Sequence, residues 1–136
     1  MKVKFRRILC PIDFDRISIP AIEFARELAR QNDAVIYLLS VVPKERTRLK
    51  TELQQVAHDS LRAVARKWLE PKISHQIVVR TGQPAKAVVE AEAEFKADLV
   101  VMTTHGRTGR SLARLGSVTE EVVRRSTCPV LTLRPS

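Results

Sequence analysis

Two glycines and a serine follow a predicted buried strand, and their spacing marks a candidate anion site. Leu99 to Thr103 form an apolar run, the loop after it carries Gly106, and a helix begins near Gly116 and Ser117. The free N–H groups of a helix start point outward, the helix dipole favours negative charge, and glycine lets a phosphate approach the backbone. A side chain at Gly116 is expected to fill the phosphate's place and to strain the backbone. The pattern favours a phosphate-binding loop, although similar loops also occur as plain surface turns.

Positive charge gathers in this loop and elsewhere in the chain. Arg107, Arg110 and Arg114 lie between the two glycines, and the formal net charge of the whole chain is +9. Basic surfaces bind nucleic acid through its phosphates without sequence preference. Only 4% of the residues are aromatic, and no known nucleic-acid-binding motif is present. We therefore expect no specific nucleic-acid partner.

The elements that must position this site alternate between strand and helix. Apolar strand-like runs cover 7–12, 34–42, 73–80, 99–103 and 130–133, and helical patterns cover 18–29, 49–68, the residues after Gly82-Gln83-Pro84, and those after Gly116. The alternation predicts right-handed crossovers and a parallel sheet with helices on both faces. The helix at 49–68 shows one apolar stripe, made of Leu49, Leu53, Val56, Leu61, Val64 and Trp68.

Ligands of such sheets bind beyond the carboxyl ends of the strands, where the strand order reverses. The strand ends are Pro11–Asp13, Val41–Val42 and Met102–Thr103. We expect these residues to lie together beside the glycine loop, which makes a binding site there more plausible than the loop alone would.

Length and cysteine content are typical of one cytoplasmic domain, predicted to span residues 1–136. The apolar run near the N-terminus is only about five residues long, too short for a secretion signal, and no run is long enough to span a bilayer. Cys10 and Cys128 lack C-x-x-C spacing, and the histidines are scattered, so no zinc site is expected. We expect two reduced cysteines, the alternative being one disulfide.

The chain resembles the universal stress protein family over essentially its whole length. The resemblance rests on ILCPIDFDRISIPAIEFA at the start, and on THGRTG, LGSV and CPVL near the end. It implies a five-stranded parallel sheet with helices on both sides, a Rossmann-like fold of the adenine-nucleotide alpha-hydrolase-like type. It also implies a homodimer and, in one large subgroup, ATP bound in a cleft at the strand ends.

The ATP-binding subgroup has the pattern G-x-x-G-x9-G-(S/T), which this chain matches except at its first position. Gly106, Gly116 and Ser117 agree with the pattern, whereas Thr103 stands where the family has its first glycine. Threonine is β-branched and disfavours positive φ. If the family's glycine serves close ligand approach, Thr103 narrows the cleft beside the ribose; if the position merely ends an extended strand, threonine fits.

The resemblance also implies roles for individual residues. The adenosine end of the cleft would be lined by Pro11, Asp13 and Val41; the ribose and phosphates would be approached by Met102, Thr103 and His105; and N–H groups for the phosphates would come from Gly106, Gly116, Ser117 and Val118. Asp13 would accept from a ribose hydroxyl or hold phosphate-bound Mg²⁺ or Mn²⁺. Its alternative role is a helix-entry turn with Ser18.

The sequence favours a binding module over an efficient enzyme. It has no Ser-His-Asp order, nucleophile elbow or Walker lysine, so at most slow ATP hydrolysis is expected. The first hypothesis is that ATP or a related adenine nucleotide is a sensed ligand in a dimeric stress-response module. The alternative is a dimeric interaction module that binds no nucleotide. In both, the last strand, Val130 to Arg134, pairs antiparallel with its two-fold mate.

Overall fold

Strands and helices alternate through the parts of the chain that the computed structural model describes, which are residues 3–14, 19–44, 49–104 and 116–134. The strands are β1 (Arg7–Pro11), β2 (Val35–Val42), β3 (His75–Thr81), β4 (Leu99–Thr103) and β5 (Val130–Leu133). The helices are α1 (Ile19–Asn32), α2 (Leu49–Trp68), α3 (Pro84–Phe95) and α4 (Ser117–Arg125). The predicted order of elements is confirmed.

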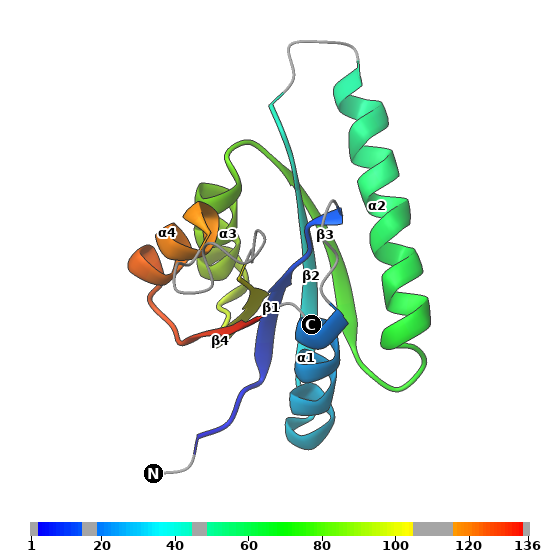
Figure 1. Ribbon diagram of the computed structural model, residues 1–136. Helices are drawn as coiled ribbons and strands as arrows, with labels where there is room; N and C mark the ends of the chain where they lie inside the picture. Colours follow the sequence, from blue (N-terminus) through cyan, green and yellow to red (C-terminus); the bar gives the residue numbers. More distant parts are fainter. Residues whose placement is uncertain (1–2, 15–18, 45–48, 105–115, 135–136) are drawn as a thin grey trace.

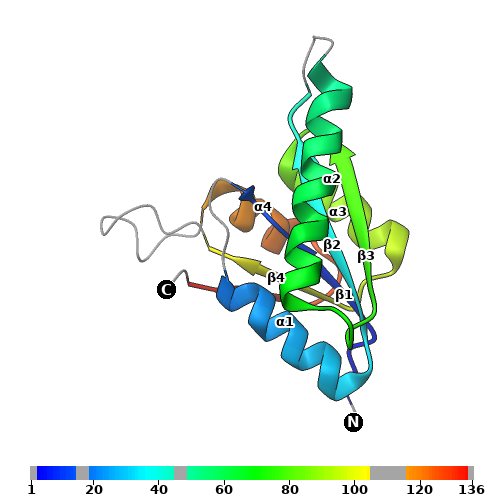
Figure 2. The same cartoon turned by 90° about the vertical axis from the view of Figure 1, so that its right-hand side faces the viewer.

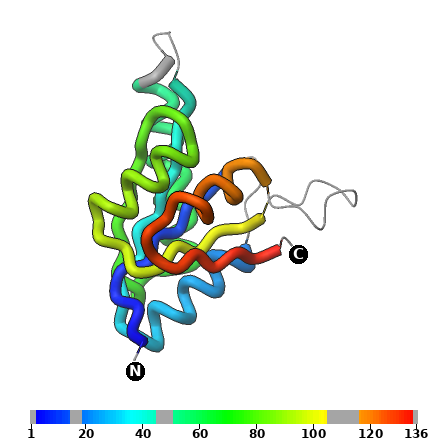
Figure 3. The backbone as a smooth tube through the Cα atoms, turned by 90° about the vertical axis from the view of Figure 1, so that its left-hand side faces the viewer, coloured from blue at the N-terminus to red at the C-terminus, as the bar shows by residue number. Residues whose placement is uncertain are grey.

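The strands form one parallel sheet in the order β3-β2-β1-β4-β5. In Figure 3 the last strand, in red, lies along the outer side of β4, in yellow. The chain moves outward from β1 to β3, then returns to place β4 on the other side of β1. This five-stranded parallel sheet is the fold that the sequence and the family resemblance predict.

Helices cover both faces of the sheet, as Figure 1 shows, with α1 and α2 on one face and α3 and α4 on the other. Figure 2 views the α1–α2 face. Alternate residues of β1 supply the two cores: Ile8 and Cys10 pack toward α1 and α2, and Leu9 packs toward α3 and α4. All three side chains have no exposed surface. A strand buried on both faces needs a continuous apolar run, which this segment has.

Several element boundaries differ from the prediction, and the largest differences are at the end of α1 and the start of β3. Helix α1 continues past Ala29 to Asn32 and ends before Asp33, whose φ of 53° leaves the helical region. Strand β3 begins at His75 rather than Ile73, because the Ile73 N–H donates to the Leu69 carbonyl oxygen over 2.9 Å. Ile73 therefore belongs to the turn that closes α2.

The apolar stripe predicted along α2 is only partly a core stripe. Leu61 is fully buried and Val64 is 9% exposed, but Leu53 is 37% exposed and Val56 62%. Helix α2 has 20 residues, about 30 Å of helix, whereas its neighbour β3 has 7 residues, about 23 Å of strand. The N-terminal part of α2 therefore extends beyond the sheet, as Figure 1 shows.

The two cysteines lie in different layers of the molecule and both are free thiols. Cys10 is buried against α1 and α2, whereas Cys128 is half-buried and packs against the core of the opposite face. The prediction of reduced packing residues is confirmed. Within the described ranges, no helix has the length and apolarity needed to cross a bilayer.

Candidate functional site

The strand order reverses between β1 and β4, and a cleft of about 520 Å³ lies there at the carboxyl edge of the sheet. This is where open parallel sheets bind ligands, since the loops after the two strands lead to opposite faces and leave a crevice. The cleft is lined by Pro11, Ile12, Asp13, Phe14, Ala21, Leu39, Ser40, Val41, Val42, Pro43, Leu53, Val56, Ala57, Ser60, Pro84, Val88, Met102, Thr103 and Val118.

The cleft brings together more than half of the residues that the sequence nominated. Those that line it are Pro11, Asp13, Val41, Met102, Thr103 and Val118. Gly116 and Ser117 do not line it but lie immediately before Val118, at the start of α4. His105 and Gly106, with Arg107, Arg110, Arg114 and Ser18, fall outside the described residues.

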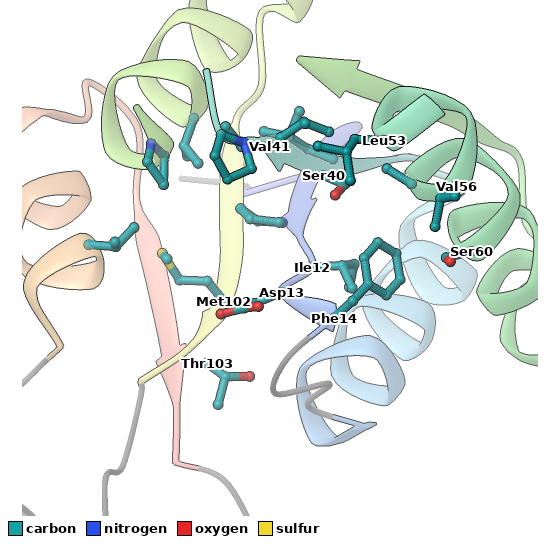
Figure 4. A pocket seen from close by; sticks show the side chains of 18 of the residues that line it. Ile12, Asp13, Phe14, Ser40, Val41, Leu53, Val56, Ser60, Met102 and Thr103 are labelled. Atoms are coloured by element: carbon teal, nitrogen blue, oxygen red, sulfur yellow. The ribbon is translucent and has the colours of Figure 1, made fainter. Parts of the chain in front are cut away.

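The register of the sheet explains why Asp13 and Thr103 lie at the same end of the cleft. Leu9 of β1 lies opposite Val100 of β4, and three further residues along each strand lead to Ile12 and to Thr103. Asp13 is one residue beyond Ile12, and neighbouring strands lie about 4.8 Å apart. In Figure 4 the two side chains lie at the same end of the cleft, beside Met102.

Thr103 ends β4 in ordinary extended backbone. It lies opposite Leu133 of β5, and the positive-φ residues other than glycine in the described ranges are Asp33 and Lys96. Of the two interpretations of this position, the structure therefore supports a strand end that accepts threonine without strain. Its carbonyl oxygen accepts a hydrogen bond from the Thr119 hydroxyl over 3.3 Å.

The Thr103 hydroxyl is buried and has no hydrogen-bond partner among the described residues. The groups around it are already engaged: the Thr119 hydroxyl donates to the Thr103 carbonyl oxygen, and the N–H and hydroxyl of Thr104 donate to the Leu133 carbonyl oxygen over 2.8 and 3.3 Å. Buried polar atoms are nearly always paired, so this orphan is a notable feature of the cleft.

Helix α4 starts at the edge of the cleft with Gly116 as its N-cap residue. No side chain caps this helix start, and the first helical hydrogen bond runs from the Glu120 N–H to the Gly116 carbonyl oxygen over 2.8 Å. The N–H groups of Ser117 and Val118 have no partner within the helix, as at any helix start. Gly116 has a φ of −61° and a ψ of 157°, which any residue adopts. The expectation of backbone strain on substituting Gly116 is therefore wrong.

The sequence did not reveal the apolar wall that α2 contributes to the cleft. Leu53 and Val56 form this wall together with Phe14, which follows β1 (Figure 4), and Ala57 of α2 also lines it. Two serines, the buried Ser40 and the half-buried Ser60, also line this part of the cleft. The sequence feature that could have indicated this wall is the length of α2, which exceeds the length of β3. Periodicity predicts the apolar stripe but does not show where a helix extends beyond its neighbouring strand.

The described residues hold no group of three or more His, Cys, Asp or Glu side chains suited to a metal ion. Asp13 is the acidic side chain among the cleft-lining residues of the described structure, and the sequence predicts a cation bound there chiefly through nucleotide phosphates. One carboxylate oxygen is compatible with Mg²⁺, which usually takes one or two protein carboxylates and completes its shell with phosphate oxygens and water.

The fold and the position of the cleft define the doubly wound α/β class of ligand-binding domain. Within that class, a model of the universal stress protein family matches residues 4–134. The chain is also 32% identical to universal stress protein MJ0531 of Methanocaldococcus jannaschii, in an alignment covering 96% of this chain and 82% of the relative. The chain belongs to the universal stress protein family.

Solved structures agree with this fold. That of protein MJ0577, from the same archaeon, has a TM-score of 0.84 at 23% identity and covers 98% of this chain and 99% of that one. A universal stress protein in complex with cAMP has a TM-score of 0.70 at 24% identity, covering 98% of this chain and 100% of that one. A universal stress protein of Archaeoglobus fulgidus in complex with dAMP has a TM-score of 0.70 at 18% identity, covering 96% and 98% of the two chains.

Proposed function

We propose that the cleft binds an adenine nucleotide, ATP or a close relative, as a sensed ligand in a dimeric stress-response module. The observation that carries the proposal is the convergence of Pro11, Asp13, Val41, Met102 and Thr103 on one cleft at the strand-order reversal. Two family members of similar fold were solved with adenine nucleotides, cAMP and dAMP.

The chemistry of the cleft suits a nucleoside. Side chains of Val41, Met102 and Val118 offer apolar contact to a purine ring. Asp13 offers an acceptor to a sugar hydroxyl. The uncapped start of α4 directs N–H groups and the positive end of its dipole toward phosphates. In its alternative role, Asp13 would instead be the protein ligand of a bound Mg²⁺ or Mn²⁺ that neutralises phosphate charge.

A short path of covalent and hydrogen bonds connects the cleft to the open edge of the sheet. Thr103 lines the cleft, and the next residue, Thr104, donates two hydrogen bonds to Leu133 of β5. Strand β5 is the last strand of the sheet. We propose that it pairs antiparallel with β5 of a second copy, since an open edge otherwise leaves N–H and C=O groups unpaired.

Titration calorimetry and thermal shift tests with ATP, ADP and AMP, each with and without Mg²⁺ or Mn²⁺, test the nucleotide proposal. We expect binding with a Kd between low micromolar and submillimolar. Native mass spectrometry of freshly purified protein adds an independent readout of co-purified nucleotide. No heat and no thermal shift at millimolar MgATP would contradict the proposal and favour the interaction module without nucleotide.

The variant Gly116→Val tests whether the start of α4 contacts the phosphates of the nucleotide, apart from any effect on the stability of the fold. Because φ at Gly116 is ordinary, valine there should fold, and its side chain should obstruct phosphates and weaken ATP binding at least about tenfold. Gln83→Val is the matched control: Gln83 is also an N-cap residue in extended backbone without a side-chain cap bond, and it does not line the cleft. Equal weakening in both variants would argue against phosphate contact at α4.

A further inference from the structure

Resting on the proposed function, we propose that the Thr103 hydroxyl makes the cleft selective for nucleotides that carry a complete ribose over their deoxy analogues. The relevant pair is Asp13, the carboxylate at the end of β1, and Thr103, the hydroxyl at the end of β4. Both line the cleft: Thr103 is the last residue of β4, and Asp13 lies two residues beyond the end of the neighbouring strand β1.

The chemistry of Asp13 and Thr103 decides which ligand group fits between them. An ionised carboxylate only accepts hydrogen bonds, whereas a threonine hydroxyl both donates and accepts. A phosphate oxygen beside Asp13 would be repelled unless a cation intervened. A sugar hydroxyl fits without help, because it donates to the Asp13 carboxylate and accepts from the Thr103 hydroxyl. The pair therefore faces the sugar, with the phosphates directed toward α4.

Thr103 would discriminate between ribose and deoxyribose nucleotides through its unpaired hydroxyl. Its hydroxyl is out of contact with water and has no partner in the described structure, an unfavourable state that a ligand hydroxyl would relieve. Thr119 cannot relieve it, since its own hydroxyl is engaged with the Thr103 carbonyl oxygen. Sites that hydrogen-bond a ligand hydroxyl reject analogues lacking it, because their buried polar groups then stay unpaired.

A ligand reaches the Thr103 hydroxyl through rotation of the threonine side chain. The backbone of Thr103 is fixed on two sides, by the Thr119 hydroxyl at its carbonyl and by the pairing of β4 with β5. Its side chain retains the staggered χ1 rotamers of threonine, which exchange the positions of the methyl and hydroxyl groups. The sugar therefore meets either the methyl, which narrows the cleft, or the hydroxyl, which pairs with it. Only a ligand with a sugar hydroxyl at this point gains a hydrogen bond from the rotamer that presents the Thr103 hydroxyl.

The experiment measures Kd values of AMP, 2′-deoxy-AMP and 3′-deoxy-AMP for the full chain and for three variants. We expect the unaltered protein to prefer AMP at least about tenfold over one of the two deoxy analogues. Thr103→Val keeps the shape of the side chain without its hydroxyl and should bring this ratio near one, through weaker AMP binding. Thr103→Ser keeps the hydroxyl and should retain the preference.

The control variant is Thr104→Val, which removes a neighbouring hydroxyl that is already bonded to Leu133 and does not line the cleft. It should keep the AMP preference. The proposal is overturned if both deoxy analogues bind the unaltered protein as tightly as AMP, or if Thr103→Val retains the preference. Failure of all adenine nucleotides to bind would instead overturn the proposed function itself, so the two failures are distinguishable.

Discussion

The Thr119 hydroxyl donates a hydrogen bond to the Thr103 carbonyl oxygen over 3.3 Å, which fastens the first turn of α4 to the end of β4. Thr119 is fully buried, so this contact is protected from water. The hydrogen bond joins the last residue of β4 to the third residue of α4. Together with the packing of Val122 in the core, this hydrogen bond holds the start of α4 beside the end of β4.

Replacing Thr119 by valine should test this fastening. The change keeps the side-chain shape but leaves the Thr103 carbonyl oxygen short of a partner, so the free energy of unfolding should fall by about 1–3 kcal/mol. Urea denaturation measures the loss. Thr51→Val, at an exposed position of α2, is the control and should change stability by about 0.5 kcal/mol or less. Equal stability of the two variants would show that the contact contributes nothing.

Glu92 of α3 fixes the turn that leads into β5. One of its carboxylate oxygens, Oε1, accepts hydrogen bonds from the Thr127 N–H, the Thr127 hydroxyl and the Cys128 N–H, over 2.8, 3.0 and 3.1 Å. Burial alone would raise the Glu92 pKa, but hydrogen bonding from the 126–128 turn outweighs it and lowers the pKa below its ordinary value of 4.5. A carboxylate with a lowered pKa in the folded state stabilises that state above the unfolded pKa.

The stability of the protein should therefore decline in acid partly through Glu92. As the pH falls below about 4.5, the unfolded chain binds this proton first, and stability is lost until the folded carboxylate protonates as well. Glu92→Gln should lower the free energy of unfolding by about 1–3 kcal/mol at pH 7. It should also reduce the dependence of that free energy on pH in the acid range. Denaturation midpoints between pH 3 and 7 measure both effects. An unchanged slope in the variant would contradict the assignment.

The thiols should be unreactive in the native state. Burial raises the pKa of Cys10 to about 12, and burial together with the nearby Glu92 charge raises the pKa of Cys128 to about 12. Since the thiolate is the nucleophile, iodoacetamide at pH 8.5 should modify neither cysteine until the protein unfolds. Glu92→Gln should speed modification of Cys128 alone. Parallel acceleration at Cys10, the internal control, would indicate unfolding instead.

Dimerisation through β5 should be sensitive to proline at only some of its positions. Residues 129 and 133 direct their carbonyls to β4, accepting from the Val100 and Thr104 N–H groups. Because residues along a strand alternate in direction, Thr132 directs its N–H to the open edge. Thr132→Pro should leave the monomer folded and abolish the dimer, as seen by light scattering.

Leu131→Pro is the matched control, since its N–H belongs to the side that pairs with β4. It should lower the thermal stability of the monomer itself by removing a ladder hydrogen bond. A monomeric unaltered protein, or a Thr132→Pro variant that remains fully dimeric, would rule out this interface.

The two halves of α2 should respond differently to truncation. Leu61 has no exposed surface, so Leu61→Ala should cost about 2–5 kcal/mol of unfolding free energy. Leu53 is 37% exposed at the wall of the cleft, and Leu53→Ala should cost about 1 kcal/mol or less. Thermal denaturation compares the pair. Similar losses at both positions would show that the N-terminal half of α2 is as tightly packed as the rest.

The amino-acid sequence by itself determined the order of elements, the parallel sheet and the cleft-lining residues at the strand ends, such as Pro11, Asp13, Met102 and Thr103. These follow from local signals: apolar runs such as Leu99–Thr103 mark buried strands, and their last residues must meet at one edge of a parallel sheet. The family motif added the start of α4 at Gly116 and Ser117.

Only the tertiary structure decided the features that depend on partners distant in the chain. The apolar stripe of α2 does not show that Leu53 faces the cleft, because the relative lengths of α2 and β3 decide where the helix leaves its sheet. The contact of Glu92 with Thr127 spans 35 positions, and no local pattern encodes it. Whether Thr103 was a strained position or an extended strand end depended on its φ, and whether its hydroxyl was paired depended on Thr119 and Leu133. Packing of segments remote in sequence sets such contacts, and periodicity records only the face each segment buries.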